Sequence, residues 1–472
     1  MKEVVLFLVL AIALPFSAMA DSFESKIDKI LNNPCLKRGK ICMVVKSMET
    51  GKVYYQRNPD EQMIPASNMK IITAAAALSK LKPWYKFSTI VSHTGEKRGD
   101  TITGDLVVSG RGDPHLVSED MWMMANEIRK RGIKQIKGSL VMDDGFFDAE
   151  PFPAGWKLSS IHKSYEAPTG ALSLNFNTVT VMVYPPDNSS SKPVVAIDPQ
   201  TPYFTVVNHL SPTSGGRAFV AIRLKPRPGG GEILEVIGRV RPGKIERVYY
   251  RAVTSPVQYF GLTFLEMLQN AGVTVGGGIT RGQAAQPLKR IFVHSSRPLL
   301  NQVVDMNKFS NNFMAEQLLK TLGAEEISSP GTVGKGISIV EELLRSWGFS
   351  NRFHLSDGSG LSKSNRVTCS LLTDVLGRMF KEWDGGPEFI SSLSVMGKDG
   401  SARKRDMGPS KPIRVKTGTL DGVSSLSGYY PLKNGEVLGF SIIFNYLPCG
   451  NGMEHHLQNR LVLELETAHD TK

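Results

Sequence analysis

The chain reads PASNMKIITAAAALSKLK over residues 65–82, and Pro83 follows directly. Most of these residues are good helix formers. Apolar side chains recur on one helical face, at Ile71, Ala74, Leu78 and Leu81. Pro65 suits the first turn of a helix, whereas Pro83 ends one. Because this helix is nearly apolar all round, we expect it to be buried at the centre of its domain.

Ser67 and Lys70 form an S-x-x-K motif at the start of this helix. Residues three apart share a helical face, so Lys70 can reach the Ser67 hydroxyl. A serine is a poor nucleophile until a base takes its proton, and lysine is a base only when neutral. Burial and a second cation, for which Lys416 is the candidate, both lower the pKa of Lys70. The backbone N–H groups of Ser67 and Thr419 are candidate oxyanion donors.

Two further motifs follow in order along the chain. Ser310 and Asn312 form an S-x-N, and Lys416, Thr417 and Gly418 form a K-T-G. We expect Ser310 to open a helix and to pass the proton from the lysine base to the leaving amine. The Asn312 amide can clamp a peptide-like substrate. Lys416 and Thr417 suit a free carboxylate, and Gly418 lets substrate approach the edge of a strand.

Each motif alone is a weak signal. An S-x-x-K also occurs at Ser79/Lys82, Ser160/Lys163, Ser189/Lys192 and Ser401/Lys404, and another S-x-N at Ser173/Asn175. Only Ser67 precedes a strongly helical segment, and K-T-G occurs once. Order and context therefore select the three motifs.

The first residues resemble a secretory signal peptide. Lys2 is followed by an apolar run over residues 4–14, and Ala18-Met19-Ala20 is a typical cleavage site. The run is short for a membrane span, although a membrane anchor is the alternative interpretation. We therefore expect export to the periplasm and a mature chain beginning at Asp21.

Composition narrows the possible partners and cofactors. The net charge is +12, but the basic residues are dispersed and no nucleic-acid-binding motif accompanies them. For an exported protein, this charge favours loose association with anionic cell-wall polymers or a membrane surface. Neither the four cysteines nor the pair His455-His456 has metal-ligand spacing, so the sequence predicts no metal and no cofactor.

The cysteines leave two interpretations open. In an oxidising compartment Cys35 and Cys42 are close enough in sequence to form a disulfide, whereas Cys42 also begins a predicted strand and can simply be buried. Cys369 and Cys449 lie in apolar surroundings and are expected to pack as small hydrophobic residues.

The pattern of secondary structure changes twice along the chain. Residues 41–46 and 52–55 predict a hairpin, residues 88–290 are mostly short strands separated by turns, and helices and strands mix again afterwards. In the last part we expect a helix over residues 311–322 that ends at Gly323, and a hairpin across Asn434-Gly435. The nucleophile precedes the strand-rich insertion and its partners follow it, so the catalytic domain is discontinuous in sequence.

The three motifs are the signature of penicillin-binding proteins and serine β-lactamases. The chain resembles the class C low-molecular-mass penicillin-binding proteins, the D-alanyl-D-alanine carboxypeptidase/endopeptidase family (peptidase family S13). Supporting segments are SGRGDP (residues 109–114), LSLNFN (residues 172–177) and DGSGLSKSN (residues 357–365), together with the long insertion.

This resemblance implies an α/β fold, in which an antiparallel sheet flanked by helices forms a transpeptidase/β-lactamase-like domain with two inserted β-rich domains. We expect a signal peptide at 1–20, the catalytic domain at 21–87 and 290–472, an inserted domain at 88–184 and 253–289, and a nested β-rich domain at 185–252. The resemblance assigns the nucleophile to Ser67, the base to Lys70, the second serine to Ser310 and the substrate lysine to Lys416. It also implies an acidic residue from the insertion near the substrate, for which Asp143 is the best match, with Asp144 as the alternative.

The sequence therefore predicts a serine-type D-Ala-D-Ala carboxypeptidase that acts on peptidoglycan stem peptides and is acylated by β-lactam antibiotics. The alternatives are a serine β-lactamase, which the insertion disfavours, and a catalytically weak wall-binding protein. The sequence leaves open the oligomeric state and the choice between carboxypeptidase and endopeptidase activity. Since every motif residue lies outside the insertion, we expect a protein without residues 88–290 to keep its catalytic elements, with weakened acylation by β-lactams and altered substrate handling.

Overall fold

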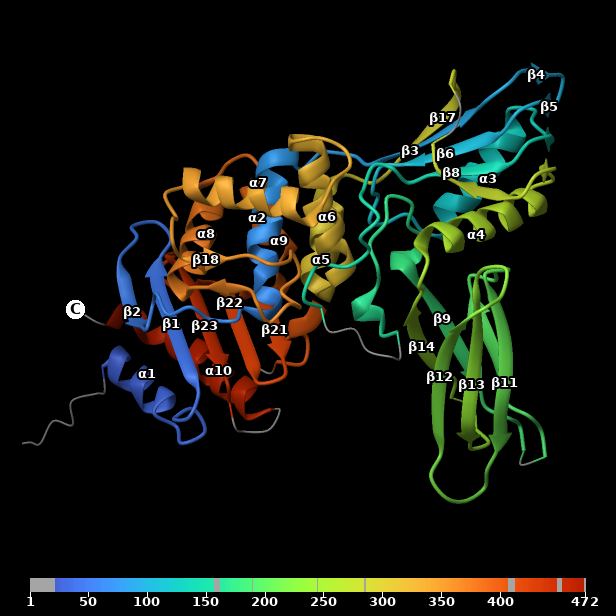
Figure 1. The fold of residues 1–472 in the computed structure, drawn as a ribbon. Coiled ribbons are helices and arrows are strands. Elements are labelled where there is room, and N and C mark those ends of the chain that lie inside the picture. The colour runs from blue at the N-terminus through green and yellow to red at the C-terminus, as the bar shows by residue number, and fades with distance from the viewer. Residues whose placement is uncertain are drawn as a thin grey trace, which may run out of the picture.

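The structure is a computed structural model that describes residues 22–156, 162–188, 190–243, 245–283, 286–405, 412–447 and 452–470. The predicted signal peptide and Cys449 lie outside the described residues. Figure 1 shows a sheet with helices on both faces, a second α/β part beside it, and a β-only part that extends from the second.

The first part is built on a six-stranded antiparallel sheet in the order β2-β1-β23-β22-β21-β20. Its strands are β1 (Lys40–Ser47), β2 (Val53–Arg57), β20 (Ser394–Val395), β21 (Arg414–Leu420), β22 (Val423–Pro431) and β23 (Val437–Asn445). The two hairpins predicted from sequence, β1–β2 and β22–β23, are confirmed. Because β1 pairs with β23, the two ends of the chain meet in one sheet.

Helices cover both faces of this sheet. One layer holds α2 (Met69–Leu81), α5 (Leu299–Phe309), α6 (Asn312–Glu326), α7 (Val333–Ser346), α8 (Cys369–Lys381) and α9 (Gly386–Ser392); the other holds α1 (Phe23–Leu31) and α10 (Met453–Glu464). Strand β1 supplies alternate residues to the two cores, as its period of two requires. Cys42 and Val44 face the first layer, whereas Met43 and Val45 face the second.

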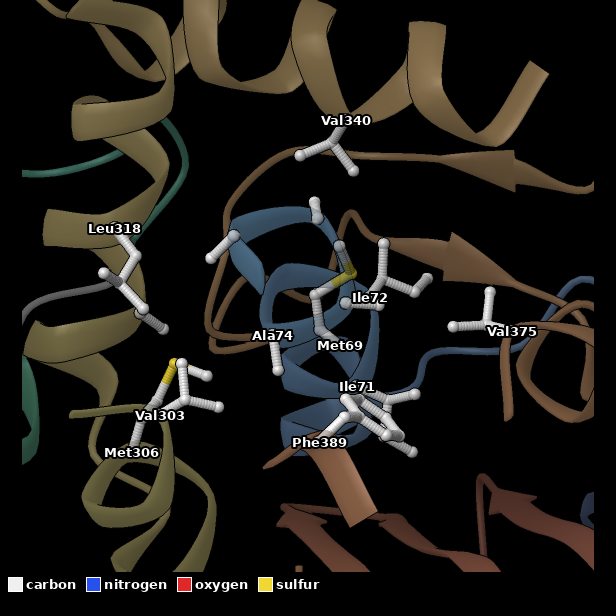
Figure 2. Packing of buried hydrophobic residues seen from close by; sticks show 14 of the residues in the cluster. Met69, Ile71, Ile72, Ala74, Val303, Met306, Leu318, Val340, Val375 and Phe389 are labelled. Carbon is white, nitrogen blue, oxygen red and sulfur yellow. The ribbon is translucent and has the colours of Figure 1, made fainter. Parts of the chain in front are cut away.

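Residues 65–82 fold as the sequence predicts. A single 3-10 turn, η1 (Ala66–Asn68), leads directly into α2, which ends just before Lys82 and Pro83. Figure 2 shows apolar side chains of α2 surrounded by neighbours from the helical layer: Val303, Met306, Leu318, Val340, Val375 and Phe389. The expected burial of this helix at the centre of its domain is confirmed.

The α6 helix is longer than predicted. It runs through Gly323 to Glu326, so the expectation that Gly323 ends it is wrong. A Cβ atom at Gly323 would lie 2.8 Å from Lys335 Cβ and 2.9 Å from the backbone nitrogen of Gly336. Glycine is needed at this position for the close crossing of α6 and α7, because any side chain would hold the two helices apart.

The insertion contains two sheets and two helices of its own. A five-stranded sheet is ordered β16-β8-β6-β3-β17, and a four-stranded sheet β15-β7-β5-β4. These elements are β3 (Ser88–His93), β4 (Lys97–Arg98), β5 (Thr101–Ile102), β6 (Leu106–Gly110), α3 (Ser118–Lys130), β7 (Gln135–Ile136), β8 (Leu140–Asp143), α4 (Pro256–Asn270), β15 (Thr274–Val275), β16 (Ile279–Arg281) and β17 (Lys289–Ser295). Strands β3 and β17 pair antiparallel from Ser88↔Ser295 onward, so the insertion begins and ends side by side.

The nested β-only part consists of two three-stranded sheets, β10-β9-β14 and β11-β13-β12. Its strands are β9 (Thr178–Tyr184), β10 (Val194–Asp198), β11 (Phe204–Pro212), β12 (Phe219–Pro226), β13 (Glu232–Val240) and β14 (Arg247–Ala252). The predicted domain limits stay a prediction, but the pairing groups β9 with this nested part rather than with the strands before it.

The cysteines pair differently from the sequence-based expectation. Cys42 on β1 forms a disulfide with Cys369 at the start of α8, with a Cα–Cα distance of 6.0 Å. The proposed Cys35–Cys42 bond is therefore wrong, as is the view of Cys369 as a small hydrophobic residue. Both cysteines are fully buried between the sheet and the helical layer. Because they lie 327 residues apart, their spacing along the chain did not indicate that they pair.

Candidate active site

The S-x-x-K residues lie together where η1 passes into α2. Lys70 Nζ is 3.1 Å from Ser67 Oγ, 2.7 Å from Asn312 Oδ1 and 2.7 Å from the carbonyl oxygen of Ser359. A neutral lysine has two N–H donors and one lone pair. The amide and carbonyl oxygens can only accept, so they take both donors. The lone pair is then left for the Ser67 hydroxyl, as a general base requires.

Burial sets the protonation state of this lysine. Lys70 is fully buried, and loss of hydration lowers its pKa to about 7, while the nearby carboxyl groups of Asp357 and Glu316 act in the opposite direction. We expected burial and the charge of Lys416 to lower the pKa of Lys70 together. Burial is the main cause at both lysines, and the charge of Lys70 lowers the pKa of Lys416 further. A substantial fraction of Lys70 is therefore neutral at neutral pH.

The prediction that Ser310 opens a helix is wrong. Ser310 lies in the turn after α5, in the left-handed backbone region with φ 56°, and Asn311 caps α6 by accepting the N–H of Met314. Lys416 Nζ donates to Ser310 Oγ at 3.0 Å and to the Thr417 carbonyl at 2.8 Å. The S-x-N and K-T-G motifs thus meet in space, and Ser310 bonds the second lysine.

Asn312 connects the base to the insertion. Its Oδ1 accepts from Lys70, and its Nδ2 donates to the carbonyl of Tyr165 at 2.9 Å. One amide hydrogen remains for a substrate, so the expected clamp has less capacity than a free asparagine. Tyr165 belongs to the insertion, which therefore completes the hydrogen bonding of the site. The expectation that acylation weakens without the insertion stays a prediction, and the contact between Asn312 and Tyr165 gives a physical reason for it.

Strand β21 presents the K-T-G residues along one side of the site. Lys416 is fully buried, Thr417 Oγ1 lies 2.6 Å from Ser401 Oγ, and Thr419 is exposed. In the described part of the chain β20 pairs only with Arg414 and Val415, so the outer edge of β21 beyond them has no strand neighbour. Such an edge can pair with an extended peptide.

Gly418 has a structural role that the sequence did not suggest. A Cβ atom there would lie 2.8 Å from the backbone nitrogen of Ser67 and 3.0 Å from the carbonyl oxygen of Pro65. The Gly418 hydrogen that stands in the place of a side chain therefore faces the turn that carries Ser67, and it does not face incoming substrate. Glycine allows β21 to pack directly against this turn, which fixes Ser67 relative to the strand.

The structure does not join Asp143 to the motifs. Asp143 ends β8, where it accepts hydrogen bonds from Ser109 Oγ at 2.9 Å and from the Gly145 N–H at 3.2 Å. Asp144 forms an ion pair with Arg281. Within the described ranges neither carboxylate has a recorded hydrogen bond or ion pair with a motif residue, so the role of Asp143 stays a prediction.

Several residues of the site were not predicted from sequence. Glu316 and Asp357 are buried carboxyl groups beside the base, and the Ser359 carbonyl contacts it directly. Asp357 also accepts the indole N–H of Trp156, from the insertion, at 3.0 Å. A sign was present for Glu316, because Asn312, Glu316 and Lys320 are spaced by four and form a polar stripe along the helix.

A cleft of about 580 Å³ lies beside Ser310 and Asn312. It is bounded by the α5–α6 turn and by the insertion. Aromatic side chains from both parts line it, namely Tyr165, Phe176, Tyr250 and Phe309. Ser67 and the K-T-G residues are not among its lining residues, so the cleft adjoins the site on the side of Ser310 and Asn312.

A serine bonded to a buried lysine, with a second serine and lysine from distant segments beside an open strand edge, defines the penicillin-recognising class of serine enzymes. The model of the D-Ala-D-Ala carboxypeptidase 3 (S13) family matches residues 23–466. The chain belongs to this family and is a serine-type carboxypeptidase of it. The family, the fold class and the enzyme class predicted from the motifs are confirmed.

Known proteins agree with this assignment. A D-alanyl-D-alanine carboxypeptidase of Actinomadura sp. strain R39 is 34% identical over 454 residues, covering 92% of this chain and 83% of the relative. The crystal structure of penicillin-binding protein 4 from Haemophilus influenzae superposes with a TM-score of 0.81 at 22% identity, covering 93% and 99% of the two chains. A structure of that protein complexed with a β-lactam has a TM-score of 0.75 at 23% identity, with the same coverage.

Proposed function

We propose that the protein removes the terminal D-alanine from peptidoglycan stem peptides through an acyl-enzyme on Ser67. The observation that carries this proposal is the geometry of Lys70, whose two N–H donors are engaged and whose lone pair is left for the Ser67 hydroxyl. The similar D-alanyl-D-alanine carboxypeptidases support the choice of substrate.

Acylation follows from this arrangement. The proton of the Ser67 hydroxyl moves to Lys70 Nζ as Oγ bonds to the carbonyl carbon of the penultimate residue. The N–H groups of Ser67 and Thr419 stabilise the oxyanion. The C–N bond then breaks, and D-alanine leaves with a proton supplied through Lys70 and the Lys416–Ser310 pair.

Deacylation uses water in the same site. The neutral Lys70 takes a proton from water as the water oxygen bonds to the acyl carbon, and it returns this proton to Ser67 Oγ as the ester breaks. A β-lactam is attacked in the same way, but its amine stays attached to the acyl group after the ring opens. The amine of the opened ring therefore occupies the position that the hydrolytic water needs, and the acyl-enzyme persists.

The K-T-G residues suit the leaving side of the substrate. Lys416 and Thr417 offer a cation and a hydroxyl to the carboxylate of the terminal D-alanine. Ser310 shares Lys416, which places the proton path next to the carboxylate anchor. In an endopeptidase reaction the leaving group is a cross-linked peptide instead, and the cleft beside Ser310 has room for it.

Intact-mass analysis after incubation with penicillin, followed by peptide mapping, tests the proposal. One adduct on Ser67 is expected, and Ser67→Ala should abolish it. Ser79→Ala is the matched control, because Ser79 and Lys82 form an S-x-x-K at the other end of the same helix. An adduct on another residue contradicts the assignment of Ser67, whereas the absence of any adduct in wild type favours a non-catalytic wall-binding protein. Rapid hydrolysis of a chromogenic cephalosporin would favour a β-lactamase.

We also propose that the protein is exported to the periplasm after cleavage behind Ala20 and associates only loosely with the wall or membrane. The Cys42–Cys369 disulfide supports an oxidising compartment. Among the described residues there is no helix with the length and apolar character to cross a membrane. N-terminal sequencing of the purified protein should begin at or near Asp21, whereas retention of residues 1–20 with extraction only in detergent would indicate an anchor.

A further inference from the structure

A buried acid next to the base has no part in the chemistry described so far. Glu316 lies on α6, one turn beyond Asn312, and its side chain is fully buried. Its Oε1 accepts the backbone N–H of Ser359 at 2.8 Å and that of Gly358 at 3.1 Å. A carboxyl group buried at a catalytic lysine is costly, so its retention calls for a physical reason.

Glu316 and the base act on the same short segment from opposite sides. Glu316 holds the N–H groups of Gly358 and Ser359, while Lys70 Nζ donates to the Ser359 carbonyl. Thr73 Oγ1 donates to the Gly358 carbonyl at 2.6 Å. The position of the Ser359 carbonyl, and hence of one of the two acceptors that orient Lys70, therefore depends on the Glu316 carboxyl group.

Four ionisable groups share this buried cluster. Lys70 from α2 has Glu316 from α6, Asp357 from the loop before β19 (Arg366–Val367) and Lys416 from β21 around it. The carboxylate of Asp357 accepts four hydrogen bonds, from the Gly360 and Ser362 N–H groups, Asn365 Nδ2 and Trp156 Nε1.

The Glu316 carboxyl group has fewer hydrogen-bond donors around it than the Asp357 carboxyl group. Burial, followed by the charge of Asp357, raises the pKa of Glu316 above that of an ordinary carboxyl group. Ionisation of Glu316 favours the charged form of Lys70, so the two groups titrate as a coupled pair.

We propose that Glu316 is a positioning residue for Lys70, which fixes the acceptor that orients the lysine and uses its own charge to set the pH range in which the lysine is neutral. This inference rests on the proposed acylation of Ser67. It goes beyond it by assigning the pH range of the reaction to a residue that does not touch substrate.

The pH dependence of penicillin acylation in Glu316→Gln tests the proposal. Glutamine keeps an acceptor for the two N–H groups but cannot carry a negative charge. The rise of the acylation rate with pH should move to lower pH by at least about 0.5 unit, because a nearby carboxylate raises a lysine pKa and its loss must lower it. A midpoint that stays in place in a folded Glu316→Gln protein overturns the proposal.

Thr73→Val is the matched control, because it loosens the same peptide segment without changing any charge. It should lower the plateau rate and leave the midpoint in place. A midpoint that moves equally in Thr73→Val would show that loosening alone accounts for the shift, and the charge role would be wrong. Failure of wild type to be acylated would overturn the proposed function instead, so the two failures are distinguishable.

Discussion

Lys70 shows how one side chain acquires its function from its surroundings. In water a lysine is protonated at neutral pH, whereas here complete burial removes the hydration that stabilises the ammonium. Asn312 and Ser359 then direct its lone pair to Ser67. The residue that performs the chemistry is thus specified by residues that only surround it.

The pKa of about 7 at Lys70 predicts the pH dependence of wild-type acylation. The active form is the neutral amine, so the rate should rise with pH through about 7. Below that value it should fall about tenfold per pH unit, as the neutral fraction does. Rapid-quench measurements of acylation between pH 5 and 9 check this. A rate independent of pH across this range would contradict Lys70 as the base.

Lys70→Ala should lower the acylation rate by at least two orders of magnitude, because general-base catalysis contributes about 10²–10⁴-fold. Stopped-flow measurement with a fluorescent penicillin determines the rate, and circular dichroism verifies folding. Lys80→Ala, on the same helix but partly exposed, is the control and should acylate at the wild-type rate. A folded Lys70→Ala protein that acylates normally would remove Lys70 from its role.

Lys416→Ala should lower activity on D-Ala-D-Ala peptides at least tenfold, because a charge-assisted hydrogen bond is worth about 1.5–3 kcal/mol. The loss must be separated from any effect on Lys70. Each protein is therefore assayed on a free-acid peptide and on its C-terminal amide. Wild type should prefer the acid strongly and the variant should not. Equal cleavage of acid and amide by wild type would favour an endopeptidase that needs no carboxylate.

At the scale of elements, α6 joins the catalytic part to the insertion. Its first residue, Asn312, bonds the Tyr165 carbonyl, and Gln317 bonds Gly170. Further along, Lys320 is only 1% exposed and pairs with Asp148 at 2.6 Å. The helix that supports the base is therefore held along its length by residues of the insertion.

Asp148→Ala should destabilise the protein by about 2–3 kcal/mol, because a buried lysine that loses its partner is strongly unfavourable. The double variant Asp148→Ala/Lys320→Met removes the buried charge as well and should regain most of the loss. Denaturant unfolding of wild type and both variants provides the comparison. Equal stability of the single and double variants would show that the pair does not hold the insertion on α6.

At the scale of the whole molecule, local patterns predicted local structure and little else. The apolar stripe of α2 and the Asn434-Gly435 turn act over a few residues, so sequence analysis identified both elements. In β11 the buried and exposed residues do not alternate, so this strand lacks the period of two that marks a strand in a sequence. The Cys42–Cys369 pair and the contact of Glu316 with Ser359 depend on which segments the topology brings together, which no spacing along the chain encodes.

The disulfide connects residues 327 positions apart, so it restricts the unfolded chain strongly. In the loop-closure account, removal of such a bond costs about 2–5 kcal/mol. Cys42→Ala/Cys369→Ala should therefore unfold at a lower temperature than wild type in differential scanning calorimetry. Unchanged unfolding temperatures would show that packing alone holds β1 against α8.

The pairing of β1 with β23 also has a consequence in time. β1 ends at Ser47 and β23 begins at Val437. At about 5–20 residues per second, a ribosome takes roughly 20–80 s to make the chain between them. For about the last third of that interval the insertion is complete through β17 and can form its own sheets, whereas the sheet behind Ser67 lacks its central strands. The nucleophile is among the first parts of the protein to be made, and the site that activates it is among the last to be assembled.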